Sequence, residues 1–352
     1  MSDHFVVKSL FKKYEVDFIS LLDFEERNYD FYIIDRNIAK LYRAALKNIL
    51  KNKRTLIVEA NEFNKTISFC ARLIGQLIKM GIRKNNRLVA IGGGVIQDIC
   101  GFIASILYRG IEWQFYPTTL LAQGDSCIGS KTSINLGKFK NLVGNFYPPS
   151  AILIDVNFLR SLPASEIKSG IGEMLHFYFI SGNRIVNDLN CEYETLFSSP
   201  TKLKKYILAS LKIKKKVIEL DEFDMNQRNL FNYGHTFGHA LETVSGYKMN
   251  HGQAVTMGMD IANYISLKYG YLNEGKFDYM HEVLSLNLPA FHLSNSQIGA
   301  YMDALSRDKK NFGGTLGCIL TKGLGLMQKR QIPFNKELKN IILSYFKWHK
   351  NV

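Results

Sequence analysis

The sequence predicts a chain of two parts, an α/β domain followed by a mainly helical domain. Short β-rich runs alternate with helical stretches up to about residue 160, and helical periodicity dominates after Pro163. A glycine turn at Gly92–Gly94 also joins a β-rich run to a helical one. Such alternation is typical of a mostly parallel sheet covered by helices. We therefore expect an α/β domain over residues 1–160 and an all-α domain over residues 161–352.

The individual elements follow from local residue patterns. Runs rich in β-branched and aromatic residues predict strands over residues 31–35, 55–59, 87–91, 112–116 and 151–155. Helical spacing of apolar residues predicts helices over residues 66–80, 165–180, 202–220, 235–247 and 254–269. Five glycines between Phe312 and Gln331 predict turns or a small hairpin near the end of the chain.

Composition argues against several classes of protein. The 352 residues are 46% hydrophobic and 22% charged, which is ordinary for a soluble globular protein. Apolar stretches are too short for a membrane span, and the charged N-terminus does not resemble a signal peptide. The five cysteines are scattered without a CxxC pair, which fits a reducing cytoplasm rather than a disulfide framework.

The net charge of +14 leaves two interpretations open. One is a solvated surface rich in Lys and Asn, and the other is a positive field that attracts anionic ligands. Nucleic-acid binding is not expected, because the densest basic run, residues 212–216, lacks interleaved aromatic residues.

Two segments of the first domain are candidates for binding phosphate. The turn Gly92–Gly94 follows a predicted strand and precedes a helix expected to start near Gln97, so the backbone and the helix N-terminus could approach an anion. The alternative is a tight strand-to-helix turn. The polar segment 117–135, followed by Lys140 and Asn141, resembles a phosphate-binding loop in composition, and otherwise predicts a long surface loop.

Histidines and a glutamate in the second domain form a candidate metal site. Glu173 and His176 share one face of a predicted helix, His235 and His239 are an i, i+4 pair, and His251 follows sixteen residues after His235. Two histidines and one glutamate form a known catalytic zinc set. Spacing alone favours the pair His235 and His239 as ligands. A dinuclear carboxylate site would need a second Glu-x-x-His, which the sequence lacks.

Taken together, these segments resemble the dehydroquinate synthase family, the sugar-phosphate cyclases. The shared motifs follow the family's order and spacing: Gly92-Gly-Gly-Val-Ile-Gln-Asp98, Arg109-Gly110, Pro117-Thr-Thr-Leu-Leu-Ala-Gln123, Asp125-Ser126, Lys131-Thr132, Lys140-Asn141, Glu173, residues 228–240 and His251-Gly-Gln-Ala-Val255.

The resemblance implies a fold, cofactors and a set of site residues. The implied fold is an NAD-binding α/β domain followed by a helical metal-binding domain, usually in a homodimer. Zn²⁺ or Co²⁺ would be held by Glu173, His235 and His251, which moves the third ligand away from His239. NAD contacts match Asp35, Glu62, Lys65, Gly93, Gly94, Val95, Asp98, Thr118, Thr119, Asp125, Lys131 and Lys140. Phosphate and substrate contacts match Arg109, Lys131, Asn141, Lys214, Arg228, Asn232, His239 and a lysine of the Lys309–Lys310 pair, with Lys310 preferred.

The implied activity is NAD- and metal-dependent cyclisation of a sugar phosphate in the cytoplasm. The steps are oxidation of a ring alcohol, phosphate elimination, reduction, ring opening and aldol closure, so that NAD is not consumed. We favour the formation of 3-dehydroquinate from a seven-carbon 3-deoxy-keto-acid phosphate. The partners are then a small-molecule sugar phosphate and a second copy of the chain, without nucleic acid or membrane.

Three residues depart from the family pattern and keep alternatives open. His176 stands where the family has Lys, Ser130 replaces a Gly, and Gln97 replaces another Gly. Histidine is shorter than lysine and titrates near neutrality, so His176 changes how the substrate would be contacted. One alternative is therefore a divergent cyclase of a secondary or cell-surface pathway. The others are a metal-dependent polyol dehydrogenase and a non-catalytic binding protein.

Overall fold

The computed structural model describes residues 3–20, 29–137, 139–182, 184–225, 227–294, 296–308 and 311–349. The chain divides into two compact units. The first unit is Met1–Pro163 with Ser199–Phe223, and the second is Ala164–Ser198 with Asp224–Val352. The expected boundary at residue 160 differs from this division in one respect, because Ser199–Phe223 groups with the first unit.

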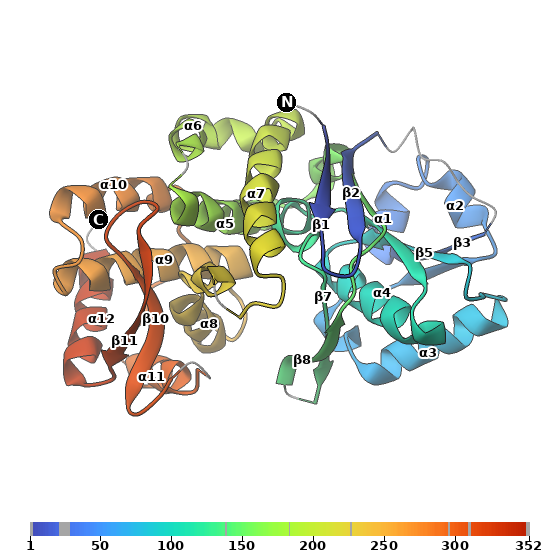
Figure 1. Ribbon diagram of the computed structural model, residues 1–352. Helices are drawn as coiled ribbons and strands as arrows, with labels where there is room; N and C mark the ends of the chain where they lie inside the picture. Colours follow the sequence, from blue (N-terminus) through green and yellow to red (C-terminus); the bar gives the residue numbers. More distant parts are fainter. Residues whose placement is uncertain are drawn as a thin grey trace. The chain divides into compact units, whose positions relative to one another are not determined.

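The first unit contains a seven-stranded sheet in the order β1-β2-β9-β6-β5-β3-β4. Figure 1 labels β1, β2, β3 and β5 of this sheet. Its strands are β1 (His4–Lys8), β2 (Lys13–Phe18), β3 (Asp30–Asp35), β4 (Thr55–Val58), β5 (Arg87–Gly92), β6 (Glu112–Pro117) and β9 (Ala151–Ile154). Only β1 and β2 pair antiparallel, and every other neighbouring pair in this sheet is parallel. The five predicted strands are confirmed, whereas β1 and β2 were not predicted.

Helices of the first unit pack on this sheet. They are α1 (Arg36–Leu41), α2 (Lys47–Lys51), α3 (Ile67–Lys79), α4 (Gly94–Ile106) and α7 (Pro200–Leu220). Residues of α1 and α2 join side chains of β3 and β5 in one hydrophobic cluster, while α4 packs against β3, β5 and β6. A buried ion pair fixes the register of β3 and β5, because Arg87 binds both carboxylate oxygens of its strand partner Asp30 at 2.9 and 2.7 Å.

Helix α7 belongs to the first unit because of where its apolar face packs. Its buried residues contact β1 and two short helical turns, η4 (Ala122–Ser126) and η5 (Val156–Ser161). The periodicity of residues 202–220 predicted the helix correctly, but it carries no information about the partner. Lys214, which lies on this helix, is therefore a residue of the first unit.

The polar segment 117–135 is not a long surface loop, which corrects one of its two interpretations. It contains η4, a single turn of π-helix, and then strand β7 (Lys131–Leu136), which pairs antiparallel with β8 (Phe139–Phe146). The buried Thr132 and Ile134 alternate with more exposed neighbours along β7, and this period-two pattern fits a strand.

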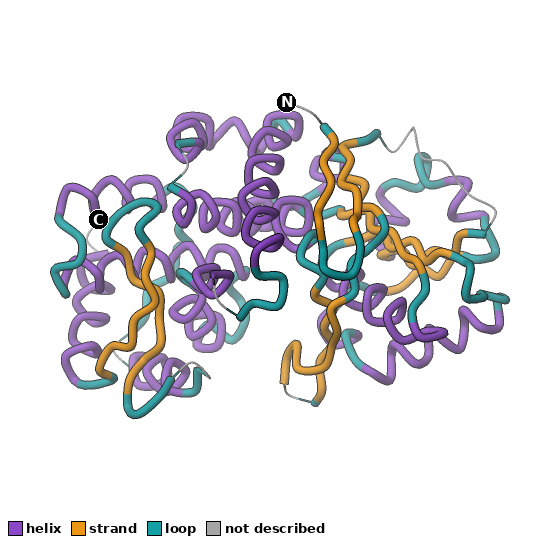
Figure 2. The backbone as a smooth tube through the Cα atoms, viewed as in Figure 1, coloured by secondary structure: helices purple, strands orange, loops and turns teal. Residues whose placement is uncertain are grey.

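The second unit is built of helices and a hairpin that stands out among them (Figure 2). Its helices are α5 (Ala164–Ser181), α6 (Ile185–Glu192), α8 (His235–Val244), α9 (His251–Lys268), α10 (Glu274–Ser285), α11 (Ile298–Ser306) and α12 (Lys336–His349). The strands β10 (Thr315–Thr321) and β11 (Met327–Pro333) form the hairpin. The mainly helical second domain is therefore confirmed, and so is the hairpin expected between Phe312 and Gln331, which adds two strands to the helices.

Helix α9 is central to the second unit. It packs against α5, α8, α10, α12 and β10, and it is buried on all sides from Ala254 to Ser266. A helix that is buried all round has no polar face to align, so periodicity defines its start poorly. This explains why α9 begins at His251 rather than at the expected residue 254. Among the described residues no helix is both long and apolar enough to cross a membrane.

Candidate functional site

Three residues from three helices of the second unit converge on one point. Glu173 lies within α5, His235 is the first residue of α8, and His251 is the first residue of α9. The Glu173 Oε1 atom lies 3.2 Å from Nε2 of His251 and 3.7 Å from Nε2 of His235. One donor atom from each residue lies within 4.8 Å of the other two, so the three residues could hold a single metal ion. Two histidines and a glutamate form a donor set that fits a divalent transition metal.

Glycines next to these residues allow the helices to approach so closely. A Cβ atom on Gly252 would lie 1.7 Å from the Ser169 carbonyl oxygen, and one on Gly172 would lie 2.0 Å from the Gly252 carbonyl oxygen. Gly234, which precedes His235, has a φ of 79° and equally lacks room for a side chain. Each candidate ligand therefore adjoins a glycine at a point of backbone contact. The sequence brings the three side chains together by removing the atoms that would separate the helices.

The ring nitrogens that face away from the centre are held in place. His235 Nδ1 lies 3.2 Å from the Tyr233 carbonyl oxygen, and His251 Nδ1 lies 3.3 Å from Glu242 Oε2. Both rings therefore direct Nε2 towards Glu173. Metal-binding histidines typically donate their other ring N–H to a carbonyl or carboxylate in this way, because the contact fixes the ring and its tautomer.

The electrostatics of this cluster favour a cation. Burial lowers the pKa of His251, but hydrogen bonds to Glu173 and Glu242, together with their charges, raise that pKa to about 10. Burial raises the pKa of Glu173, but the interactions of its carboxylate with the neighbouring histidines outweigh the effect of burial and bring this pKa below its usual value. A buried carboxylate among ring nitrogens thus favours positive charge, either a proton or a metal ion.

His239 and His176 lie next to this cluster but are not part of the group formed by Glu173, His235 and His251. His239 is exposed, and its ring stacks on that of His251 at 5.6 Å; with Glu242 and His251 it forms a second group of donor atoms within 4.8 Å. His176 is 1% exposed and packs edge-on against Phe177 and Phe231, with its ring 5.0 Å from that of His235. The pair favoured by spacing, His235 and His239, is therefore not the pair that meets Glu173.

Other expected substrate residues of the second unit lie on the segment before α8. Arg228 is buried, and the Asn232 side chain donates to the Asn229 carbonyl oxygen at 3.0 Å. Lys309 and Lys310 lie outside the described residues.

The glycine turn of the first unit leads directly into α4. The Gly92 carbonyl oxygen accepts a hydrogen bond from the Thr118 N–H at 2.9 Å, so the turn is held against the segment that follows β6. A Cβ atom on Gly93 would lie 2.9 Å from the Thr119 methyl group, whereas one on Gly94 would meet nothing closer than 3.9 Å. Helix α4 begins at Gly94, earlier than the expected start near Gln97, so the backbone N–H groups at its N-terminus adjoin the turn itself.

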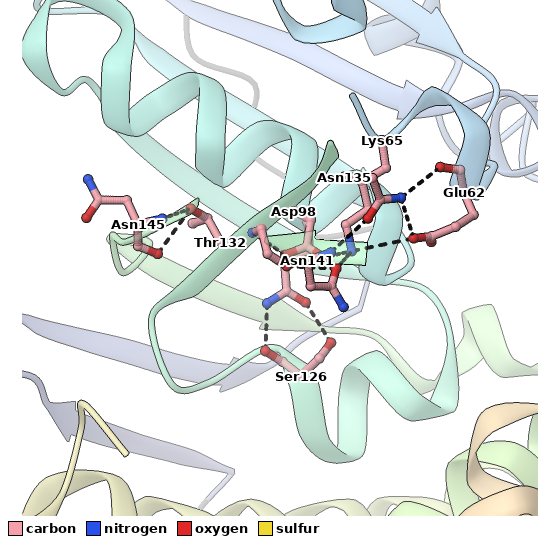
Figure 3. Close-up of polar contacts among 10 residues, drawn as sticks. Glu62, Lys65, Asp98, Ser126, Thr132, Asn135, Asn141 and Asn145 are labelled. Carbon is pink, nitrogen blue, oxygen red and sulfur yellow. Dashed lines mark hydrogen bonds and ion pairs between the residues drawn. The ribbon is translucent and has the colours of Figure 1, made fainter. Parts of the chain in front are cut away.

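Beside this turn, several expected cofactor residues form one polar network (Figure 3). Lys65 is 5% exposed, and its Nζ atom lies 2.6 Å from Asp98 Oδ2 and 2.5 Å from Asn141 Oδ1. Glu62 accepts a hydrogen bond from the Asn135 side chain at 2.8 Å and lies 4.0 Å from Lys65. Burial raises the pKa of Asp98, and the contact with Lys65 opposes that rise.

A second ion pair joins Asp125 of η4 to Lys214 of α7 at 2.7 Å. Nearby, Ser130 has a φ of 63°, a conformation that glycine adopts more readily, and its hydroxyl donates to buried Glu222. The Glu222 carboxylate also accepts from Ser9 Oγ and the Leu10 N–H at 2.7 Å each. Ser130 thus ties the Lys131 segment to the turn between β1 and β2.

The remaining expected residues of the first unit are more dispersed. Asp35 caps α1, and its carboxylate accepts the Asn37 N–H. Thr118 is buried, Val95 and Thr119 are half-buried, and Arg109, Lys131 and Lys140 are exposed. Sequence reasoning did not single out Glu242, Ser210 or Glu222. The spacing of Glu242, seven residues after His235 on one helix face, was the available signal for the first of them.

The fold and these two sites define a class of protein. One unit has a mostly parallel sheet with a glycine turn, and the other is mainly helical and carries a candidate metal site of two histidines and one glutamate. The chain belongs to the 3-dehydroquinate synthase family. Residues 55–169 match the family model described as 3-dehydroquinate synthase N-terminal, and residues 170–311 match 3-dehydroquinate synthase C-terminal.

Individual relatives agree with this membership. The chain is 37% identical to a 3-dehydroquinate synthase of Dictyoglomus thermophilum over 318 residues, which cover 90% of this chain and 88% of the relative. It is 34% identical to a 3-dehydroquinate synthase of Helicobacter pylori over 343 residues, 96% of this chain and 97% of the relative. A crystal structure of 2-deoxy-scyllo-inosose synthase complexed with carbaglucose-6-phosphate, NAD⁺ and Co²⁺ superposes with a TM-score of 0.84 at 25% identity, covering 96% and 99% of the two chains.

Proposed function

We propose that the chain is an NAD- and metal-dependent sugar-phosphate cyclase, and that its product is 3-dehydroquinate. The relatives that carry this name are 34 to 37% identical and are matched over nearly their full length. The single observation that carries the proposal is the convergence of Glu173, His235 and His251 with both Nδ1 atoms anchored. Two histidines and one glutamate, each histidine with its second ring nitrogen anchored, form a donor set that suits a catalytic divalent metal ion.

The proposed metal is Zn²⁺ or Co²⁺, held by Glu173, His235 and His251. When bound, such an ion lowers the pKa of a coordinated alcohol and polarises a carbonyl. The chain supplies three ligands, which leaves a coordination position for substrate. Glu242 and the Tyr233 carbonyl would keep the two rings aimed at the ion.

The proposed second cofactor is NAD, bound at the glycine turn of the first unit. It supplies reversible oxidation of one substrate alcohol. The open face of Gly94 and the N–H groups at the start of α4 suit a pyrophosphate. Lys65 and Asp98 form a buried pair beside the turn, which would order the loop that meets the dinucleotide.

The substrate is proposed to be a phosphorylated 3-deoxy-keto acid. Exposed Arg109, Lys131 and His239 are cations or donors that suit a phosphate, and buried Arg228 suits a carboxylate through a bidentate contact. Lys214 and Asn232 are proposed to contact ring hydroxyls. The positive net charge of the chain favours such an anion.

A second candidate is a cyclase that accepts another sugar phosphate, and His176 is the observation that favours it. The side chain at this position is 1% exposed and packed between aromatic rings, so it is not extended towards solvent as a lysine ammonium group would be. One cation of the family's substrate contacts is thereby absent from this position. We rank this candidate second because Arg228 is retained.

The testing experiment uses the purified chain with NAD⁺, Co²⁺ or Zn²⁺ and a panel of sugar phosphates. We expect inorganic phosphate and a carbocyclic product in equal amounts from the seven-carbon 3-deoxy-keto-acid phosphate, without accumulation of NADH. Release from a different sugar phosphate alone would replace the first candidate with the second. Stoichiometric NADH without phosphate would instead identify a polyol dehydrogenase.

We further propose that the protein acts as a homodimer in the cytoplasm. The β7–β8 hairpin supports self-association, because Phe139 and Leu142 are 68% and 62% exposed on it. Light scattering coupled to size-exclusion chromatography measures this directly. A mass of one chain at micromolar concentration would contradict the dimer.

A further inference from the structure

The turn η4 ends with three consecutive carbonyl oxygens that accept hydrogen bonds from side chains. Gly124 O accepts from Ser210 Oγ at 2.7 Å, and Asp125 O accepts from Lys214 Nζ at 2.7 Å. Ser126 O accepts from Gln97 Nε2 at 2.6 Å. A carbonyl at the end of a helical turn lacks the backbone donor that a longer helix would supply. In this chain α7 supplies two of the three donors and α4 supplies the third.

Gln97 uses both ends of its amide for this contact. Its Nε2 atom donates to Ser126 O, and its Oε1 atom accepts from Ser126 Oγ at 2.7 Å. Gln97 is 7% exposed and lies in the first turn of α4. Ser126 Oγ lies 3.9 Å from the position of a Cβ atom on Gly94, so the contact joins η4 to the start of α4.

Asp125 is held between these contacts. Its backbone is fixed by hydrogen bonds to the carbonyl oxygens of its own residue and of both neighbours, and its carboxylate lies 2.7 Å from Lys214 Nζ. π-helical turns such as η4 are frequently found at functional sites. A binding group that is held in place before the ligand arrives loses less conformational entropy on binding.

We infer that Gln97 and Ser210 are positioning residues, which hold η4 so that Asp125 stands ready for the dinucleotide at the glycine turn. This inference rests on the proposed function, because it takes NAD as the ligand of that turn. It assigns a role to Gln97, one of the three residues at which the sequence departs from the family pattern. Without the amide, η4 would lose two hydrogen bonds to α4 and would have to be ordered by the cofactor itself.

The test measures the dissociation constant for NAD⁺ by isothermal titration calorimetry on the full chain. We expect Gln97→Ala to raise this constant about tenfold, because η4 loses both hydrogen bonds to α4 and must then be ordered when NAD⁺ binds. Ser126→Ala removes only one of those bonds and should raise it about threefold. Ser105→Ala is the matched control, because Ser105 lies on the same helix and its hydroxyl contacts only the Phe102 carbonyl among the described contacts.

A double-mutant cycle separates positioning from general destabilisation. In the double variant Gln97→Ala with Ser126→Ala, the effects should not add, because both changes remove parts of one contact. Metal content of the second unit and the KM for the sugar phosphate should stay within twofold of the wild type, while the KM for NAD⁺ rises. Additive effects, or an NAD⁺ affinity of Gln97→Ala within twofold of the wild type, would overturn the inference and leave the proposed function intact. A wild-type chain that does not bind NAD⁺ would overturn both.

Discussion

Replacing Glu242 by Gln tests how the metal centre is held. The change keeps the size of the side chain and removes the charge that accepts the His251 Nδ1–H at 3.3 Å. A hydrogen bond to a charged group contributes about 1.5–3 kcal/mol when buried. The His251 and Glu242 side chains are 36% and 16% exposed, so solvent screening places the loss near the lower end of that range. About 1.4 kcal/mol corresponds to a tenfold weaker metal affinity, which agrees with the usual effect of losing such a contact.

The assay is a competition for Zn²⁺ or Co²⁺ between the purified chain and a chromophoric chelator. Glu282→Gln on α10 removes an exposed carboxylate of the same unit and is the control, with unchanged affinity expected. His235→Ala should abolish specific metal binding, whereas His239→Ala should spare it. An affinity of Glu242→Gln equal to that of Glu282→Gln would refute the account of how His251 is oriented. Equal metal loss in His235→Ala and His239→Ala would show that the ligand set is wrong.

Three further predictions follow from the packing and the polar contacts. Gly252→Ala places a Cβ atom 1.7 Å from a carbonyl oxygen of α5, so it should lower the free energy of unfolding by about 2 kcal/mol or more and abolish metal binding. In the control Gly275→Ala the new Cβ atom meets nothing within 4 Å, so the stability measured by chemical unfolding should be equal or higher. Lys65→Met leaves the Asp98 carboxylate without its cation, so it should destabilise the first unit by about 3 kcal/mol and weaken NAD⁺ binding. Adding Asp98→Asn should restore part of the stability. A single variant as stable as the wild type would contradict the claim that this buried ion pair stabilises the unit. Burial lowers the pKa of His281, but its hydrogen bond to a buried aspartate of α9 and the charge of that aspartate raise the pKa above the ordinary value. The contribution of this contact to stability is therefore complete below pH about 6.5 and is lost as the pH rises through the folded-state pKa. The difference in unfolding free energy between wild type and His281→Gln should shrink with rising pH, and a constant difference would contradict this reasoning.

The parallel strands of the sheet were predictable because each one is indicated by the residues of its own short segment. Residues 31–34 and 88–91 are continuous hydrophobic runs, as expected for strands buried on both faces. Helix α7 shows what such local patterns do not predict, namely the packing partners of an element. Its periodicity predicts a helix, but its grouping with the first unit depends on contacts with η4, η5 and β1, which are distant in sequence. The hairpin β7–β8 was likewise obscured because the polar residues of the segment resemble those of a loop.

The candidate metal centre was predictable in composition and ambiguous in geometry. Three histidines within seventeen residues indicated a site, yet spacing favoured His239 because only contacts within one helix can be judged from sequence. His251 meets Glu173 because α5 and α9 touch through Gly172 and Gly252, and that approach is a property of two helices together.

The most direct test of the central claim, that oxidation and reduction occur within one catalytic cycle, follows the substrate's own hydrogen. The 3-deoxy-keto-acid phosphate is deuterated at the carbon whose alcohol is proposed to be oxidised, and the product is analysed by mass spectrometry with unlabelled NAD⁺ present. We predict that each carbocyclic product molecule retains the deuterium, that one phosphate is released per product, and that NADH does not accumulate. Loss of the label from the product, or NADH formed in proportion to turnover, would contradict the account.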